Sequence, residues 1–391
     1  MDKLVYLFYP AMLLVLLWGS KWYGRRQWNE EAFSLGQTKA WQGFFALLIM
    51  LHHVGQKTCA SWLPQNWPRQ PGLEPFVPFG YYYVGFFLVC SGYGLYKSWK
   101  NKPDYLRGFL KRSVLPLLLV YLIVDRVYLI VRLTQGVSMT NEQTIWYLIG
   151  AQQANPNAWY VLALPVFYVI FWLCFRLIRR ETPALLLTTL GVLAWVLVGC
   201  ATDHNDWWMR GEWWYNSAMF FPLGLWLARA EGKLIPHVKR LWWVYLLLAA
   251  VAVPGMHWVA EYARSAFGYY CEWVPELSGR ILRRGVTALA EFGAALPFVA
   301  AVILLGMKVR IGNAALRLMS CVTLEFYLMH GLFVELFAFR CLDKLRPAYY
   351  VSNVFFYGLA VFVCGLVSAL ILRQIMGLFR QKARKDLPAS P

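Results

Sequence analysis

Eleven long apolar segments recur along the chain, and they restrict its fold more than any other feature. A helix that crosses a bilayer needs about 20 mostly apolar residues. Only 15% of the 391 residues are charged, and 59% are hydrophobic, which excludes a disordered protein and an ordinary soluble enzyme. We predict an all-α, polytopic membrane protein with about eleven transmembrane helices, at residues 4–20, 41–54, 79–97, 114–133, 158–176, 183–200, 213–229, 241–259, 286–306, 318–337 and 350–372.

The basic residues alternate between the connections, and this alternation predicts the orientation of the chain. Lys and Arg number 38 against 20 Asp and Glu, a net charge of +18. The connections after the odd-numbered segments hold 25 of the 38, and the N-terminus with the remaining connections holds 11. Because basic loops stay on the cytoplasmic side, we expect the N-terminus outside and the C-terminus in the cytoplasm.

The second segment ends in a histidine pair, the strongest candidate for chemistry, because ionisable groups in lipid are costly. Gln42 and His53 are eleven positions apart, which places them about 20° apart around a helix and roughly 16 Å apart along it. Lys39 lies about 40° from that face, and His52 points about 100° away. We therefore take His53 as the candidate catalytic residue. A histidine pair that merely ends the helix at the membrane interface is the alternative.

The tenth segment contains more polar groups than anchoring in a membrane requires, among them Glu325. Polar residues at three- or four-residue spacing predict a stripe that faces the bundle interior, formed by Ser320, Thr323, Tyr327 and His330. Hydrogen bonding between helices without chemistry is an equal alternative. In the fourth segment, Asp125 is interpreted as a structural partner of another helix. No metal-binding spacing occurs, so we expect no metal site.

Six motifs follow one another along the chain. They are QGFFALLIMLHH (Gln42, His53), FFLVCSGYGLY (Phe86, Phe87, Ser91, Gly92, Tyr93), FLKRSVLPLLLVY (Lys111, Arg112, Pro116), NAWYVLALPVFY (Trp159, Tyr160), WWYNSAMFFPLGLWLA (Phe221, Gly224) and LEFYLMHG (Tyr327, His330). In this order, over roughly residues 38–372, they resemble the acyltransferase 3 family of integral membrane acyltransferases. That family usually has Arg where this chain has Gln42. Either Lys39 replaces that charge, or this subgroup works without it.

The resemblance implies a membrane acyltransferase domain at residues 31–376 with a core of about ten spans. Residues 1–30 are then an additional N-terminal transmembrane anchor, and residues 377–391 a basic cytoplasmic tail. It also implies transfer of an acyl group, usually acetyl from cytosolic acetyl-CoA, to a hydroxyl of a cell-surface or lipid-linked carbohydrate. We expect a multi-pass protein of a bacterial plasma membrane, with no nucleic-acid partner.

Site roles follow from the resemblance and from the chemistry of the side chains. His53 is expected to act as general base on the acceptor hydroxyl, because imidazole titrates near working pH; an acyl-histidine intermediate stays open. The supporting residues expected in the active site are Gln42, Lys39, Ser91, Tyr93, Glu325, Tyr327 and His330. Ser91, Tyr327 or His330 is expected to donate to the oxyanion. The residues expected to bind acyl-CoA are Lys111, Arg112, Trp159 and Tyr160.

Three other functions compete with acyl transfer. A proton-coupled transporter or flippase would use the buried His and Glu as a relay, but the chain has no internal repeat. A polyprenyl-linked glycosyltransferase would need acidic metal-binding loops, which the outer connections lack. A non-enzymatic scaffold is the third reading, if Gln42 marks a lost active site.

Overall fold

The computed structural model describes residues 3–205, 209–268, 270–340 and 345–385, and it is 73% helical with almost no strand. The helices are α1 (Phe8–Leu17), α2 (Leu35–Thr58), α3 (Gly80–Asn101), α4 (Leu115–Thr134), α5 (Asn141–Ile149), α6 (Trp159–Leu177), α7 (Glu181–Ala201), α8 (Phe220–Arg240), α9 (Trp242–Phe267), α10 (Leu277–Gly306), α11 (Ala314–Leu336) and α12 (Val354–Lys385). Two short strands, β1 (Lys21–Trp22) and β2 (Val309–Arg310), pair antiparallel. Every predicted apolar segment overlaps one of these helices.

In the described residues, seven helices are long and apolar enough to cross a membrane: α4 with the turn before it, α6, α7, α9, α10, α11 and α12. The all-helical membrane architecture is therefore confirmed, whereas the count of eleven spans and the orientation stay predictions. α2 and α3 fall outside the seven although most of their residues are buried. Other helices surround them, so they tolerate more polar residues than a lipid-facing helix does.

Several boundaries differ from the prediction. The seventh segment was expected at 213–229, but Glu212–Trp214 form a separate 3₁₀ turn and α8 continues to Arg240 through a charged stretch. The expected loop 134–157 contains α5, which begins with a capping box formed by Thr140 and Gln143. Such a box satisfies the free amide groups of the first helical turn. It can therefore begin a helix that the apolar pattern does not reveal. The tail expected from residue 377 is helical to Lys385, and residues 386–391 lie outside the described part.

The N-terminal segment packs against the rest of the protein. A 3₁₀ turn (Lys3–Leu7) and α1 together are only ~25 Å long, shorter than a hydrocarbon core of ~30 Å. The ring of Phe8 packs at a tilt against that of Phe355 of α12, with ring centroids 5.2 Å apart. Nδ2 of Asn313 donates to the carbonyl oxygens of Val15 at 2.8 Å and Trp18 at 3.0 Å. The segment expected to be an added anchor is thus bound to the starts of both α11 and α12.

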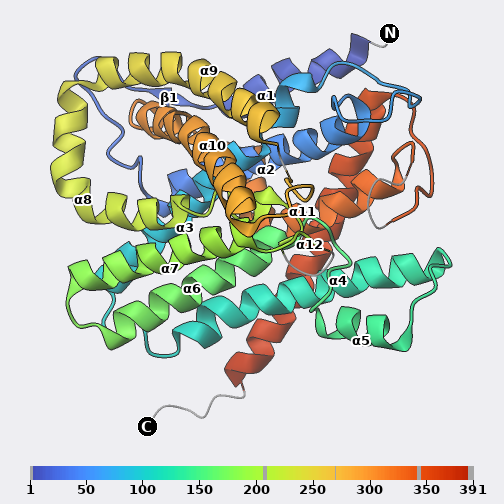
Figure 1. The fold of residues 1–391 in the computed structure, drawn as a ribbon. Helices are drawn as coiled ribbons and strands as arrows, with labels where there is room; N and C mark the ends of the chain where they lie inside the picture. The colour runs from blue at the N-terminus through green and yellow to red at the C-terminus, as the bar shows by residue number, and fades with distance from the viewer. Residues whose placement is uncertain (1–2, 206–208, 269, 341–344, 386–391) are drawn as a thin grey trace.

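The centre of the bundle is a pair of parallel helices, α2 and α11. The side chain of Gln37 bonds both backbone groups of Ile311, at 2.7 and 3.1 Å, and so joins the beginnings of the two helices. Farther along, a Cβ at Gly43 would lie 2.9 Å from the backbone nitrogen of Ser320. Figure 1 shows α9 and α10 on one side of this centre, and α4, α6 and α7 on the other. Buried α11 residues therefore meet α2 residues at a nearly constant difference in residue number.

Candidate functional site

The two histidines expected on different helices meet at the centre of the bundle. Nδ1 of His53 lies 2.7 Å from Nε2 of His330, and the two rings are nearly parallel, at 11°. His330 is fully buried, and His53 is half-buried. On the far side of His330, a Cβ at Gly365 of α12 would lie 3.2 Å from its Cβ. His330 is therefore enclosed, while His53 retains an accessible edge.

The hydrogen-bond partners determine where the protons lie when both rings are neutral. Nδ1 of His330 lies 2.8 Å from the carbonyl oxygen of Phe326, which only accepts. Nδ1 of His330 therefore carries the proton, and its Nε2 is an acceptor. Nδ1 of His53 donates to that acceptor, so Nε2 of His53 is the unprotonated nitrogen. This arrangement can take a proton at a single defined atom.

A buried ion pair keeps α2 and α11 in the register that brings the histidines together. Nζ of Lys57 lies 2.6 Å from Oε1 of Glu335, and their side chains are 7% and 2% exposed. Lys57 is one helical turn beyond His53, and Glu335 is five residues beyond His330. Lys57 is not among the site residues predicted from the sequence. A signal was present, because each histidine is followed within five residues by an ionisable residue at the end of an apolar helix.

Aromatic side chains and a buried loop surround the histidine pair. The ring of Tyr327 is 6.1 Å from His330 and 5.7 Å from Tyr160 between centroids. The loop before α6 is held by Asp125, whose Oδ1 accepts from the amides of Ala154 and Asn155 at 2.8 and 2.9 Å. Asp125 thus has a structural role, as expected, although it bonds to backbone rather than to another helix.

Asn155 attaches this loop to α11, the helix that contains His330. Its Nδ2 donates a hydrogen bond to the carbonyl oxygen of Leu328 at 3.1 Å. The bend of α11 lies just before this region. Val322 has non-helical angles (φ −117°, ψ 15°), and the hydroxyl of Thr323 donates to the Met319 carbonyl at 2.8 Å. Such hydrogen bonds often bend helices. The second half of α11 is buried on all sides.

Four of the expected site residues lie near the opposite end of α2 and α3. Gln42 is half-buried and Lys39 exposed, roughly 16 and 21 Å from His53 along α2. The hydroxyl of Ser91 pairs with that of Tyr168 at 2.9 Å. Tyr93 donates to Oε2 of Glu231 at 2.9 Å. None of these contacts reaches the histidine pair.

His52 and the expected site residue Glu325 face away from the reacting nitrogen. His52 is directed to the carbonyl of Phe76, 3.2 Å from its Nδ1, as the helical geometry of the pair predicts. A Cβ at Gly80 would lie 2.5 Å from Nε2 of His52, so a larger residue there would displace the imidazole. Glu325 is buried, but it is about 140° around α11 from His330.

The residues expected to bind acyl-CoA lie at opposite ends of α6. Tyr160, beside Trp159, contacts Tyr327 at the histidine end. Lys111 and Arg112 lie in a π-helical turn (Leu110–Val114) before α4, which packs near the other end of α6. A donor that touches both groups must be extended, because the two regions lie far apart along the helix.

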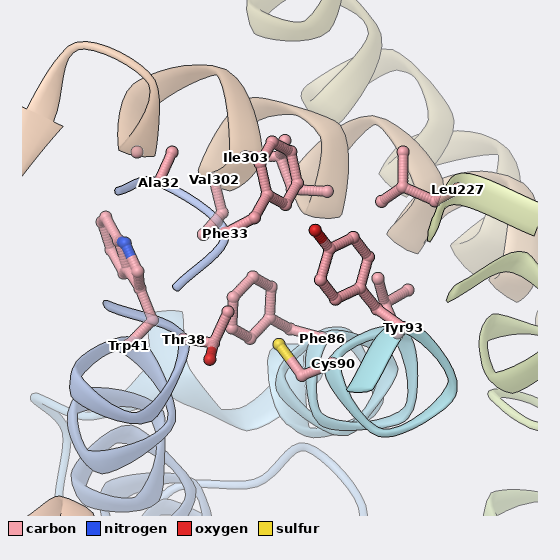
Figure 2. A pocket seen from close by; sticks show the side chains of 12 residues that line it. Ala32, Phe33, Thr38, Trp41, Phe86, Cys90, Tyr93, Leu227, Val302 and Ile303 are labelled. Atoms are coloured by element: carbon pink, nitrogen blue, oxygen red, sulfur yellow. The ribbon is translucent and has the colours of Figure 1, made fainter. Parts of the chain in front are cut away.

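Two cavities lie toward that other end. One, of about 30 Å³, opens between α2, α3 and α10, and Figure 2 shows Cys90 and Tyr93 projecting into it from α3. This volume has room for only about two water molecules, too little for an acyl-carrier arm. The second, of about 330 Å³, lies where the end of α3 and the loop that follows it, residues 102–107, meet the end of α6. Neither is lined by His53.

A separate buried polar cluster lies between α7 and α10. Glu212 and Arg284 are fully buried, and the Arg284 guanidinium donates to the carbonyls of Tyr270, Cys200 and Thr202. Nδ2 of Asn216 donates to Glu291 at 2.8 Å. Burial, with the charge of Glu291 nearby, raises the pKa of the Glu212 carboxyl. Across the described ranges, no group of three or more His, Cys, Asp or Glu is arranged to hold a metal ion.

Comparison with known proteins supports one family. The family model described as an acyltransferase domain matches residues 39–373, which is most of the chain. This match includes both histidines, the Lys57–Glu335 pair and the loop before α6. Comparisons with curated proteins and with solved structures gave no match.

Proposed function

Because the chain belongs to the acyltransferase 3 family, we propose that it transfers an acyl group, in the first place acetyl, from a cytosolic acyl-CoA to a hydroxyl of a cell-surface or lipid-linked carbohydrate. The observation that carries the site assignment is the contact of 2.7 Å between His53 and His330. Two helices far apart in sequence present complementary nitrogens there, inside an apolar bundle.

In the proposed reaction, Nε2 of His53 takes the proton of the acceptor hydroxyl as that oxygen attacks the thioester carbonyl. Collapse of the tetrahedral intermediate breaks the C–S bond, and the thiolate takes the proton back from His53. The ester and the free thiol are the products, so no other reactant is needed. General-base catalysis of this kind contributes about 10²- to 10⁴-fold in rate.

His330 acts as a positioning residue in this scheme. When His53 becomes cationic, its hydrogen bond to His330 becomes charge-assisted and therefore stronger. The stabilisation is greater in the transition state than in the ground state, which is the condition for faster chemistry. The Lys57–Glu335 contact keeps a positive charge one turn away compensated, so it opposes the imidazolium less.

Tyr327 is the donor that we propose for the oxyanion, because its ring borders His330, whereas Ser91 is bonded to Tyr168 near the other end. In the predicted orientation, His53 lies toward the outer end of α2. The acceptor therefore approaches from outside, and the donor arm reaches the site from the cytoplasmic side.

Purified protein in nanodiscs tests this assignment through the release of free thiol from acetyl-CoA with a carbohydrate acceptor. We expect His53→Ala to lower the rate about 10²- to 10⁴-fold and His52→Ala, the matched control on the neighbouring position, to retain most activity. His330→Gln keeps an acceptor for Nδ1 of His53 and is expected to exceed His330→Leu in rate.

Robust transfer by a folded His53→Ala protein would refute the mechanism. A proton-coupled transporter or flippase would leave the thioester intact in this assay. Mass spectrometry of cell-envelope glycans from cells with and without the gene then identifies the acceptor, since an added acyl mass must disappear with the gene.

A further inference from the structure

The cavity of about 330 Å³ between the end of α3, the loop that follows it and the end of α6 is a chemically distinctive surface. Three cationic side chains line it, Lys102, Arg107 and Arg176, together with one carboxylate, Asp104. Three aromatic rings lie beside them, those of Trp99, Tyr105 and Phe175. The three cations are exposed. A hollow that combines several cations with aromatic faces has the composition of sites for phosphorylated nucleosides.

The cations of the cavity differ from their neighbours on α3 in how they are paired. On the same stretch of α3, Lys97 pairs with Glu231 at 2.7 Å and Lys100 with Glu181 at 2.9 Å. Among the residues that the structure describes, no ion pair is formed by the three cations of the cavity: Lys102, Arg107 and Arg176. With Asp104 as the one carboxylate of the lining, three positive charges against one negative leave the cavity a net charge of +2 for an anionic ligand.

The wall of the cavity is held in place by bonds to backbone. Nη1 and Nη2 of Arg112 donate to the carbonyls of Arg107 at 2.8 Å and Tyr105 at 2.7 Å. Nε1 of Trp172 donates to the carbonyl of Leu106 at 3.1 Å. Arg112 thus shapes the loop rather than presenting its guanidinium to a ligand. A preformed site loses less entropy on binding.

The position of the cavity restricts the ligand. Phe175, at the cavity, and Tyr160, at the histidine end, both belong to α6 and lie ~22 Å apart along it. A donor whose charged end occupies the cavity needs a long uncharged arm to bring its acyl group to His53. A coenzyme A thioester has this form, whereas acetyl phosphate does not.

We infer that this cavity binds the phosphorylated nucleotide end of the acyl donor, with the phosphates on Lys102, Arg107 and Arg176 and the base against the aromatic rings. The inference rests on the proposed function, because it names the donor end of the same reaction. It also replaces the Lys111–Arg112 pair as the main phosphate contact.

Calorimetric titration with 3′-phospho-ADP, which is the nucleotide end of coenzyme A without its arm, tests the cavity directly. The full chain is used in nanodiscs of neutral lipid. We expect Lys102→Gln, Arg107→Gln and Arg176→Gln each to weaken binding about tenfold, the size of one lost charge-assisted contact. Arg179→Gln removes the same charge three residues beyond Arg176, outside the cavity, and is expected to bind normally.

Equal affinity in the cavity variants and in Arg179→Gln would overturn the inference. So would a wild-type protein that ignores the nucleotide in neutral nanodiscs but retains anionic phospholipid through the same three cations, since a lipid headgroup would then be the ligand. His53→Ala separates the two proposals, because it is expected to lose transferase activity and to bind the nucleotide normally. Normal nucleotide binding by a wild-type protein without transferase activity would refute the function and leave the cavity assignment intact.

Discussion

Replacing Gly92 by alanine is expected to force α3 and α8 apart. A Cβ at Gly92 would lie 2.0 Å from the carbonyl oxygen of Phe221, and one at Gly224 would lie 2.1 Å from the carbonyl oxygen of Val89. Both clashes involve backbone atoms, which cannot move away by changing a rotamer. Two glycines singled out in separate sequence motifs therefore form one close helix crossing, of the kind that small residues allow in membrane proteins.

The loss of folding stability in Gly92→Ala follows from these clash distances. Ordinary contact begins at 3.4 Å, so the helices must separate locally by ~1.4 Å, and a gap of 0.5–1 Å already forfeits about a quarter to a half of each dispersion contact. Overpacking usually costs about 1–3 kcal/mol, and a rigid backbone partner places Gly92→Ala near ~3 kcal/mol. The double variant with Gly224→Ala should cost less than the sum, because one separation relieves both clashes.

Reversible unfolding in mixed micelles, followed by tryptophan fluorescence, measures this cost. Gly94→Ala is the matched control, since no atom lies within 4 Å of a Cβ there. That variant is expected to be neutral or stabilised by up to about 1 kcal/mol through helix propensity. Equal stability of Gly92→Ala and Gly94→Ala would show that the crossing is looser than the structure indicates.

Two further predictions concern buried charge. Lys57→Met should destabilise the protein by about 3–5 kcal/mol because it removes the buried cation that pairs with Glu335, whereas Lys57→Met with Glu335→Leu should recover most of that loss. Unfolding of both variants checks this. Glu212→Gln should become increasingly stable relative to the wild type as pH rises. The folded protein holds a proton on Glu212 that the unfolded chain releases above its ordinary pKa, so wild-type stability falls with pH at up to about 1.4 kcal/mol per unit between the unfolded and folded pKa values. Parallel pH profiles for the two proteins would contradict this reasoning.

Much of the fold was predictable because it depends on local properties. The apolar segments identified every long helix, and the 100° step along a helix separated His53 from His52, which bond to different partners in the structure. The boundaries were less accurate where local hydrogen bonds act. The capping box at Thr140 begins α5. Glu212–Trp214 form a separate 3₁₀ turn before α8.

The candidate site was predictable only in part. Tyr327 and His330 were grouped with His53 by the motif resemblance, and the structure places them together. Ser91 was grouped in the same way, yet it bonds to Tyr168, because α3 runs antiparallel to α2 and carries Ser91 away from the histidine end. The role of Arg112 also depends on where its backbone partners lie.

The sequence by itself determined that the chain forms apolar helices, which of their faces are polar, and which family it belongs to. These properties follow from the transfer free energy of each segment and from fixed helical spacing. Only the tertiary structure decided which polar groups meet. The contacts of His53 with His330 and of Lys57 with Glu335 depend on the parallel packing of α2 and α11 in one register. That register is set by close contacts such as Gly43 against Ser320, which spacing within either helix does not encode.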